Sequence, residues 1–279
     1  MNYLRANGCG NTFLIFDFIE NNQIECNINT IKGIHEKEGY KNIDSCLLLY
    51  SDSCILNDID SDSLVIEMDV FEKDDVVVQK DKFCGNGARV VSQYLHEKYK
   101  NKKEFFIKKN NTLVHLYKKD DVFGVDMGKV SFIDNKKEFF VSDLEYIDIL
   151  FLEKEIRFFY VYVNEPHLIT FVPLSYEMLY YIGSDINQTK KNIFPLGINV
   201  NTIIVLNEKE IKINTYERGV EDITKACGTG STSAVALIMK LNIFSSRIKN
   251  INVINPGGVL EISKNNNNFY LFGPTEINY

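Results

Sequence analysis

Residues 83–88 read Phe-Cys-Gly-Asn-Gly-Ala, and residues 226–231 read Ala-Cys-Gly-Thr-Gly-Ser. In both stretches a cysteine, Cys84 or Cys227, precedes a turn of small residues, and an apolar run with helical periodicity follows. The pattern predicts a cysteine at the N-terminus of a helix twice in one chain, at positions separated by half the chain length. This near-repeat indicates two similar units, each built around the helix that follows its cysteine.

Runs of β-branched and aromatic residues surround both predicted helices, and such runs are typical of strands. In the first half, we expect strands at 13–16, 46–50, 64–68, 76–78, 105–107 and 112–117, and a helix at 88–95. In the second half, strands at 158–163, 168–172, 201–206 and 210–216 precede a helix at 231–241, and strands at 259–262 and 269–272 follow it. Because the order of strands and helix repeats, the sequence indicates an internal duplication.

The polar stretch Lys118–Val122 separates the two repeats. A chain of 279 residues can hold two domains of typical size. We therefore expect one domain over residues 1–120 and a second over residues 121–265. The Asn-rich tract Asn265–Asn268 is expected to form a turn or a loop.

The composition argues against several classes of protein. A net charge of −7 and scattered basic residues disfavour a nucleic-acid partner. No apolar run approaches the roughly 20 residues that a membrane-spanning helix needs, so no membrane partner is expected. The first residues lack the apolar core of a signal peptide, and we therefore expect a cytoplasmic protein. The oligomeric state stays open, with a homodimer as one option.

The cysteines and histidines do not suggest a metal site. Six cysteines and four histidines are present, without a metal-ligand spacing such as C-x-x-C. Cys26, Cys46 and Cys54 are interpreted as small buried apolar residues. Cys84 and Cys227 differ from them because each carries the Gly-rich turn. We therefore expect these two thiols, and no metal ion, to carry the chemistry.

A helix start offers unpaired N–H groups and the positive end of a dipole, which bind an anion and lower a cysteine pKa towards neutrality. Two such starts facing one another would hold a carboxylate between two thiols. The expected donors are the backbone N–H groups of Gly85, Asn86, Gly228 and Thr229. Inverting an α-carbon requires a base on one face and an acid on the other, and a thiolate and a thiol suit these roles. The sequence therefore predicts a two-base enzyme that acts on a small molecule.

Further stretches stand in order along the chain. They are Gly-Cys-Gly-Asn-Thr-Phe at 8–13, Asn-Glu-Pro-His at 164–167, Gly-Ile-Asn-Val-Asn at 197–201, Tyr-Glu-Arg-Gly at 216–219, Pro-Gly-Gly at 256–258 and Phe-Gly-Pro at 272–274. Together with the two thiol turns, they make the chain resemble the diaminopimelate epimerase family, the cofactor-independent amino-acid racemases and epimerases.

The resemblance implies an α/β (α+β) fold of two pseudo-symmetric domains, each a curved, mostly antiparallel sheet wrapped round a central helix. It implies that residues 266–279 pack back on the first domain. It also implies an amino-acid substrate, no pyridoxal or other cofactor, and Cys84 and Cys227 as the acid–base pair.

The resemblance assigns further roles. Asn11 and Asn199 become polar substrate contacts, Asn199 at the distal end. Loop-borne His167 would orient or polarise a cysteine, or serve only as a structural hydrogen-bonding residue. Glu217 suits an ammonium and Arg218 a carboxylate, the alternative being an ordinary ion pair.

Two positions depart from the family pattern. Glu165 stands where the family has an asparagine, and an alignment through an insertion gives the same change at Glu72. An ionised glutamate repels a distal carboxylate, whereas an asparagine can donate to it. If Arg218 neutralises one of these glutamates, a dicarboxylate substrate can still bind. Two glutamates would instead favour a substrate with a cationic tail.

Three functions therefore stay open. The first is epimerisation of LL-diaminopimelate to meso-diaminopimelate, in lysine biosynthesis. The second is racemisation of a basic amino acid: lysine, ornithine or arginine. The third is a non-catalytic binding protein on the same fold, for which both thiols would be surplus.

Overall fold

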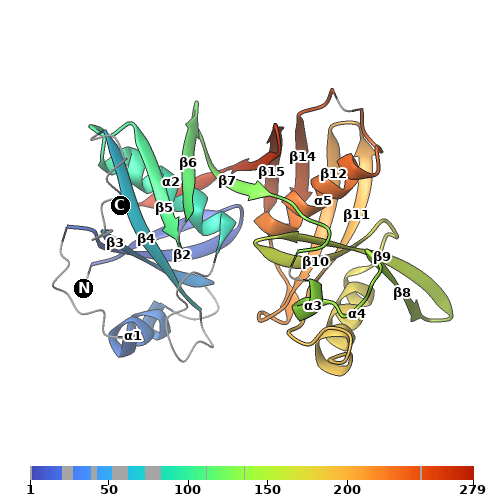
Figure 1. Cartoon of the computed structure of the whole chain (residues 1–279). Coiled ribbons are helices and arrows are strands. Elements are labelled where there is room, and N and C mark those ends of the chain that lie inside the picture. Colours follow the sequence, from blue (N-terminus) through green and yellow to red (C-terminus); the bar gives the residue numbers. More distant parts are fainter. Residues whose placement is uncertain are drawn as a thin grey trace. The chain divides into compact units, whose positions relative to one another are not determined.

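The computed structural model describes residues 2–20, 28–38, 43–51, 62–72, 83–110, 112–134, 136–245 and 247–279 (Figure 1). The chain divides into two compact units. Unit 1 comprises Met1–Asp126 and Phe272–Tyr279, and unit 2 comprises Met127–Leu271. Cys26, Cys54 and the expected strand at 76–78 lie outside the described residues.

The polar stretches used to place the domain boundaries are hairpin turns. Asp120 has a φ of 55° and Asn266 a φ of 52°, the left-handed values that tight turns require. One turn joins strands β6 (Thr112–Lys119) and β7 (Val122–Lys129), and the other joins β15 (Gly258–Asn265) and β16 (Asn268–Gly273). The chain passes between units inside β7 and β16, a few residues after each turn.

Unit 1 is a sheet with two helices. Its further strands are β1 (Leu4–Gly8), β2 (Asn11–Phe18), β3 (Ser45–Ser51), β4 (Ser63–Glu72), β5 (Glu104–Lys109) and β17 (Thr275–Asn278). The strand pairs β2–β3 and β4–β5 are parallel, and β17–β1, β1–β2, β3–β4, β5–β6 and β6–β7 are antiparallel. Helix α1 (Ile28–Glu38) connects β2 to β3, and helix α2 (Gly85–Lys98) lies between β4 and β5 in the chain.

Unit 2 repeats this arrangement. Its further elements are α3 (Lys136–Phe139), β8 (Tyr146–Phe151), β9 (Lys154–Val163), β10 (Glu165–Thr170), α4 (Tyr176–Thr189), β11 (Asn199–Asn207), β12 (Glu210–Glu217), β13 (Asp222–Ile223), α5 (Gly228–Lys240) and β14 (Asn250–Asn255). The pairs β9–β10, β11–β12 and β14–β15 are antiparallel, and β10–β11 and β12–β14 are parallel. This is the succession that β1 to β6 follow in unit 1, so the predicted duplication is confirmed.

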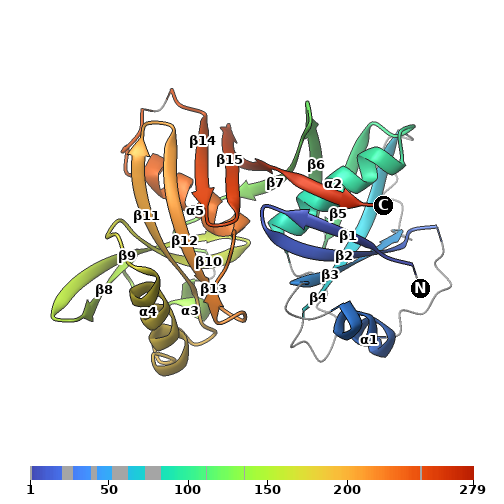
Figure 2. The same cartoon turned by 180° about the vertical axis from the view of Figure 1, so that it is seen from behind.

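In each unit the sheet curves round one helix. Helix α2 contacts β17 and β1 at one end of its sheet and β5 and β6 towards the other. Helix α5 contacts β9, β10, β11, β12 and β15. Both views show this helix among the strands of unit 2 (Figures 1 and 2). Every residue of α5 from Gly228 to Ile238 is buried, as expected of a helix enclosed on all sides. The predicted α/β fold, with a central helix in each unit, is therefore confirmed.

A second helix covers the outer face of each sheet. Helix α1 contributes Ile31 to a core with Leu14, Leu48 and Phe71. Helix α4 contributes Leu179, Ile182 and Ile186 to a larger core in unit 2. The sequence did not predict either helix.

Among the described residues, no helix combines the length and apolar composition that crossing a bilayer requires.

Candidate active site

Cys84 is the N-cap of α2, as the sequence predicts. Its backbone is extended, with φ −118° and ψ 103°, and its Sγ accepts a hydrogen bond of 3.3 Å from the N–H of Gly87. The first bond within the helix runs from Ala88 N to Cys84 O, so the N–H groups of Gly85 and Asn86 precede the helical ladder. An acceptor sulfur at this position meets donors that favour negative charge.

Cys227 caps α5 in the same way. Its φ and ψ are −119° and 113°, and its Sγ accepts a 3.3 Å hydrogen bond from Gly230 N–H. The helical ladder begins with Ser231 N to Cys227 O, which leaves the N–H groups of Gly228 and Thr229 ahead of it. Each unit therefore contains the same local arrangement: a cysteine sulfur and two backbone N–H groups at the start of a helix.

In unit 1, a chain of side chains runs from Asn11 into the core. Asn86 Nδ2 donates to Asn11 Oδ1 at 3.0 Å, and Asn86 Oδ1 accepts from Arg89 Nη2 at 2.9 Å. Arg89 is fully buried, and its Nη1 donates to the carbonyl of Pro274 at 3.0 Å. Burial lowers the pKa of Arg89 to about 10, and the nearby Cys9 and Cys84 sulfurs act in the opposite direction.

Sequence analysis missed Arg89. The available signal was a strongly basic residue directly after the first turn of the helix. Glu72 lies at the end of β4 and is half-buried, but residues 73–75 of the proposed substrate loop lie outside the described residues. The role of Glu72 therefore stays a prediction.

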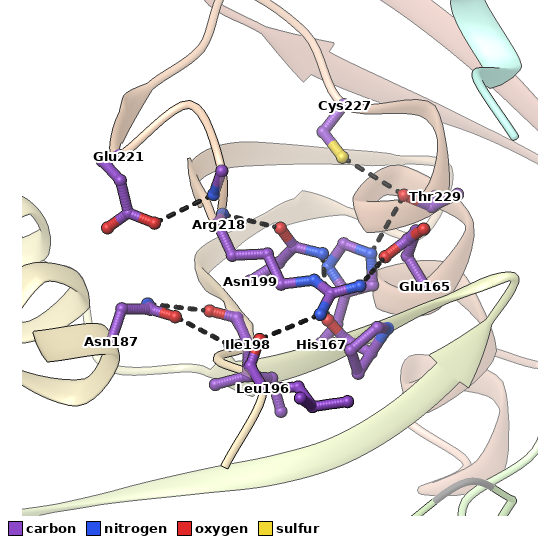
Figure 3. Close-up of polar contacts among 12 residues, drawn as sticks. Glu165, His167, Asn187, Leu196, Ile198, Asn199, Arg218, Glu221, Cys227 and Thr229 are labelled. Atoms are coloured by element: carbon purple, nitrogen blue, oxygen red, sulfur yellow. Dashed lines mark hydrogen bonds and ion pairs between the residues drawn. The ribbon is translucent and has the colours of Figure 1, made fainter. Parts of the chain in front are cut away.

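His167 lies in strand β10 and not in a loop, because the segment after Pro166 pairs with both β9 and β11. It is fully buried, with Nε2 at 3.0 Å from Thr229 Oγ1 and Nδ1 at 3.1 Å from Asn201 Nδ2. Thr229 Oγ1 lies 3.3 Å from Cys227 Sγ, so His167 reaches this cysteine through a hydroxyl (Figure 3). Burial lowers the pKa of His167 to about 3, with Arg218 acting in the same direction, so the imidazole is neutral at pH 7.

The expected lowering of a cysteine pKa is wrong for Cys227. Burial raises its pKa well above the usual range, and the nearby Glu217 carboxylate adds to the rise. Hydrogen bonds from Thr229 and Gly230 oppose this rise without overcoming it. The helix-start donors are present, but desolvation of the thiolate outweighs them. Cys227 is therefore a thiol at neutral pH and can serve as a proton donor.

Glu165 and Arg218 form an ion pair, with Arg218 Nη2 at 2.7 Å from Glu165 Oε2 (Figure 3). Arg218 Nη1 also donates to the carbonyl of Leu196 at 3.0 Å, and its guanidinium lies 4.7 Å from the ring centroid of Phe139. The negative charge that Glu165 introduces is thus matched by a positive charge from the same unit.

The Asn199 side chain is buried and holds two backbone segments together. Its Nδ2 donates to the carbonyl of Pro166 at 3.0 Å, and its Oδ1 accepts from the N–H of Arg218 at 3.0 Å. Glu217, the neighbour of Arg218, accepts a short hydrogen bond from the hydroxyl of Thr224. Asn199 therefore holds the backbone of Arg218 in position.

Among the described residues, no cluster of three or more His, Cys, Asp or Glu side chains could hold a metal ion.

The sequence comparisons match this chain to diaminopimelate epimerases, and the structure comparison matches its fold. A family profile described as diaminopimelate epimerase matches residues 159–277. The diaminopimelate epimerase of Ligilactobacillus salivarius is 38% identical over 191 residues, which cover 63% of this chain and 58% of that protein. The diaminopimelate epimerase of Thermotoga maritima is 32% identical over 209 residues, 74% of this chain and 75% of that protein. A solved hydroxyproline epimerase from Agrobacterium vitis shares the fold, with a TM-score of 0.67, 13% identity and coverage of 99% of this chain and 90% of that one.

Proposed function

Because the chain belongs to the diaminopimelate epimerase family of isomerases, we propose that it interconverts LL- and meso-diaminopimelate, with Cys84 and Cys227 as its acid and base. The observation that carries this proposal is the repeated cap: each cysteine begins a buried helix with closely similar backbone angles and accepts an N–H bond of the same length. Such symmetry suits a reaction whose forward and reverse directions exchange the roles of two groups.

The proposed step is a balanced proton transfer. A thiolate at Cys84 takes the α-hydrogen as a proton, so that the C–H bond breaks, an S–H bond forms and the electron pair stays on the substrate. The Cys227 thiol then gives its proton to the opposite face of the same carbon and becomes a thiolate. The reverse reaction runs from Cys227 to Cys84. The raised pKa of Cys227 supports its starting as the acid.

The substrate α-carboxylate would lie at the helix starts. Its donors would be the N–H groups of Gly85, Asn86, Gly228 and Thr229, which precede the helical ladders. Charge develops on this carboxylate as the α-carbon loses its proton. Fixed N–H dipoles in a site that excludes water stabilise such charge without having to reorganise.

The Glu165–Arg218 pair supports diaminopimelate as the substrate. An unpaired Glu165 would repel a distal carboxylate, but its pairing with Arg218 removes the net charge. A guanidinium has five N–H groups, and the bonds to Glu165 and Leu196 use two of them. Arg218 can therefore still donate to a carboxylate. In the alternative function, the cationic tail of a basic amino acid would lie beside the Glu165 carboxylate, whose charge Arg218 already neutralises.

Exchange of α-hydrogen in D₂O tests the proposal. LL-diaminopimelate, lysine, ornithine and arginine are each incubated with the enzyme, and loss of the α-proton signal is followed by NMR. We expect exchange and epimerisation with diaminopimelate and none with the three basic amino acids. Exchange with a basic amino acid alone would establish the alternative racemase. Binding of diaminopimelate without exchange at any pH would favour a non-catalytic protein.

A further inference from the structure

The side-chain amide of Asn201 has one possible orientation. Its Oδ1 accepts from the hydroxyl of Thr215 at 2.8 Å, and its Nδ2 donates to the carbonyl of Leu168 at 3.0 Å. A carbonyl oxygen only accepts, so the NH₂ group and not the amide oxygen must face Leu168. The same NH₂ group lies 3.1 Å from His167 Nδ1. Since an amide nitrogen only donates, Nδ1 of His167 accepts and carries no proton.

This assignment fixes the tautomer of His167. The ring is fully buried and, with a pKa lowered to about 3 by burial, neutral at physiological pH. A neutral imidazole without a proton on Nδ1 carries it on Nε2. Nε2 lies 3.0 Å from Thr229 Oγ1, so His167 donates and the hydroxyl oxygen accepts.

The hydrogen of the Thr229 hydroxyl is then available for Cys227, whose Sγ lies 3.3 Å from Oγ1. Gly230 N–H points at the same sulfur from 3.3 Å. We infer that His167 is a positioning residue: it is not a base, and it turns the Thr229 hydroxyl into a fixed donor to the Cys227 sulfur. The inference rests on the proposed role of Cys227 as an acid that becomes a thiolate in each turnover.

Such a donor meets a specific need of this buried site. When Cys227 releases its proton, the thiolate is enclosed and faces the Glu217 carboxylate, and both conditions disfavour it. The neighbouring His167 is neutral, and Arg218 is paired with Glu165. The hydroxyl of Thr229 and the N–H of Gly230 are therefore the groups that stabilise the negative sulfur.

The tautomer can be observed in the wild-type protein. ¹⁵N-labelled imidazole nitrogens give distinct shifts and couplings for the Nε2–H, Nδ1–H and doubly protonated forms. Four histidines are present, and the signals that His167→Gln removes identify the ring in question. We expect the Nε2–H form from pH 5 to pH 8. An Nδ1–H form, or a charged ring at pH 7, would overturn the inference.

The effect on sulfur is measured by alkylation of Cys227 with iodoacetamide across pH, in a Cys84→Ser background, with the Cys227 peptide quantified by mass spectrometry. Thr229→Val keeps the shape of the side chain but removes its hydroxyl. We expect the pH at which Cys227 alkylation reaches half its maximal rate to rise by about one to two units. Thr229→Ser should restore the wild-type midpoint. Thr232→Val is the matched control, because this buried hydroxyl on the same helix donates to Gly228 O.

An unchanged midpoint in Thr229→Val, or an equal rise in Thr232→Val, would contradict the inference. Neither experiment uses an amino-acid substrate. A wrong assignment of diaminopimelate as substrate would therefore leave both results readable, and the two proposals can fail separately.

Discussion

Arg89 brings a positive charge into the buried start of α2, where it donates to Asn86 Oδ1 and Pro274 O. Because a guanidinium only donates, Asn86 must turn its oxygen to Arg89 and its NH₂ group to Asn11. Asn11 Oδ1 is thereby occupied, so the NH₂ group is the part of the Asn11 amide that could donate to a ligand. The buried Arg89 cation therefore fixes the orientation of the amide groups of Asn86 and Asn11.

We expect Arg89→Met to separate stability from activity. Removing the buried charge relieves its desolvation, which offsets the loss of a donor to Asn86 Oδ1 and Pro274 O, so the unfolding temperature should change little. The oriented amides are lost, and kcat/KM should fall by about tenfold or more, as for a lost hydrogen bond to a charged group. Thermal unfolding and initial rates measured on one preparation check both parts. A large drop in unfolding temperature with normal kinetics would mean that Arg89 is purely structural.

His167 should make the protein sensitive to acid. An unfolded histidine has a pKa of about 6.5, whereas burial lowers the folded value to about 3. Between these values only the unfolded state binds the proton, so stability falls as pH decreases from 6.5 towards 3, by about 1.4 kcal/mol per pH unit for this one group. Urea unfolding at several pH values should show a shallower slope for His167→Gln. Equal slopes for the two proteins would refute this origin of acid sensitivity.

At the level of elements, the contact of α5 with its sheet depends on Gly230. A Cβ there would lie 2.8 Å from Asn201 Oδ1 and 3.1 Å from Thr215 Oγ1. Asn201 cannot give way easily because its amide is held by Thr215, Leu168 and His167. The glycine therefore lets the helix start approach β11 and β12 closely.

Gly230→Ala should cost about 1–3 kcal/mol of stability through overpacking and should also displace the N–H that reaches Cys227. Gly33 in α1 offers the control, since a Cβ there meets nothing within 4 Å. Gly33→Ala should stabilise the protein by about 0.5–1 kcal/mol, the usual gain of alanine over glycine in a helix. Equilibrium unfolding of both variants gives the comparison, and a stable, fully active Gly230→Ala protein would contradict the close-contact argument.

The same elements show how far the sequence predicts the structure. Helices α2 and α5 were predictable because a small-residue turn and apolar periodicity mark each one. Helix α4 was not, because its tyrosines and isoleucines favour strands. Its one clear signal was Ser175, whose hydroxyl caps the helix by accepting from Met178 N–H. The cysteines and His167 stood in recognisable motifs, whereas Asn201 and Thr215 are ordinary strand residues whose role depends on which side chains they meet.

Across the whole molecule, a duplicated framework carries two chemically different copies of one site. The second residue after each cysteine is Asn86 in unit 1 and Thr229 in unit 2. A buried basic residue holds each of them, charged Arg89 in one case and neutral His167 in the other. Glu217 lies near Cys227, which adds negative charge to that copy. Duplication thus supplies two thiols, and divergence of their neighbours gives each thiol different surroundings, which for Cys227 raise the pKa.

This difference predicts complementary defects in Cys84→Ser and Cys227→Ser. In the proposed mechanism, each cysteine would remove the α-hydrogen from one epimer only, because the hydrogen points to the opposite face in the other. Interconversion should fall by about 100-fold or more in both variants. Each variant should still exchange α-hydrogen with D₂O for the epimer that its remaining cysteine faces, LL in one case and meso in the other. NMR of both epimers with both variants measures this pattern. If either variant epimerised at the wild-type rate, or if both exchanged the same epimer, two cysteines could not be acting on opposite faces of one carbon.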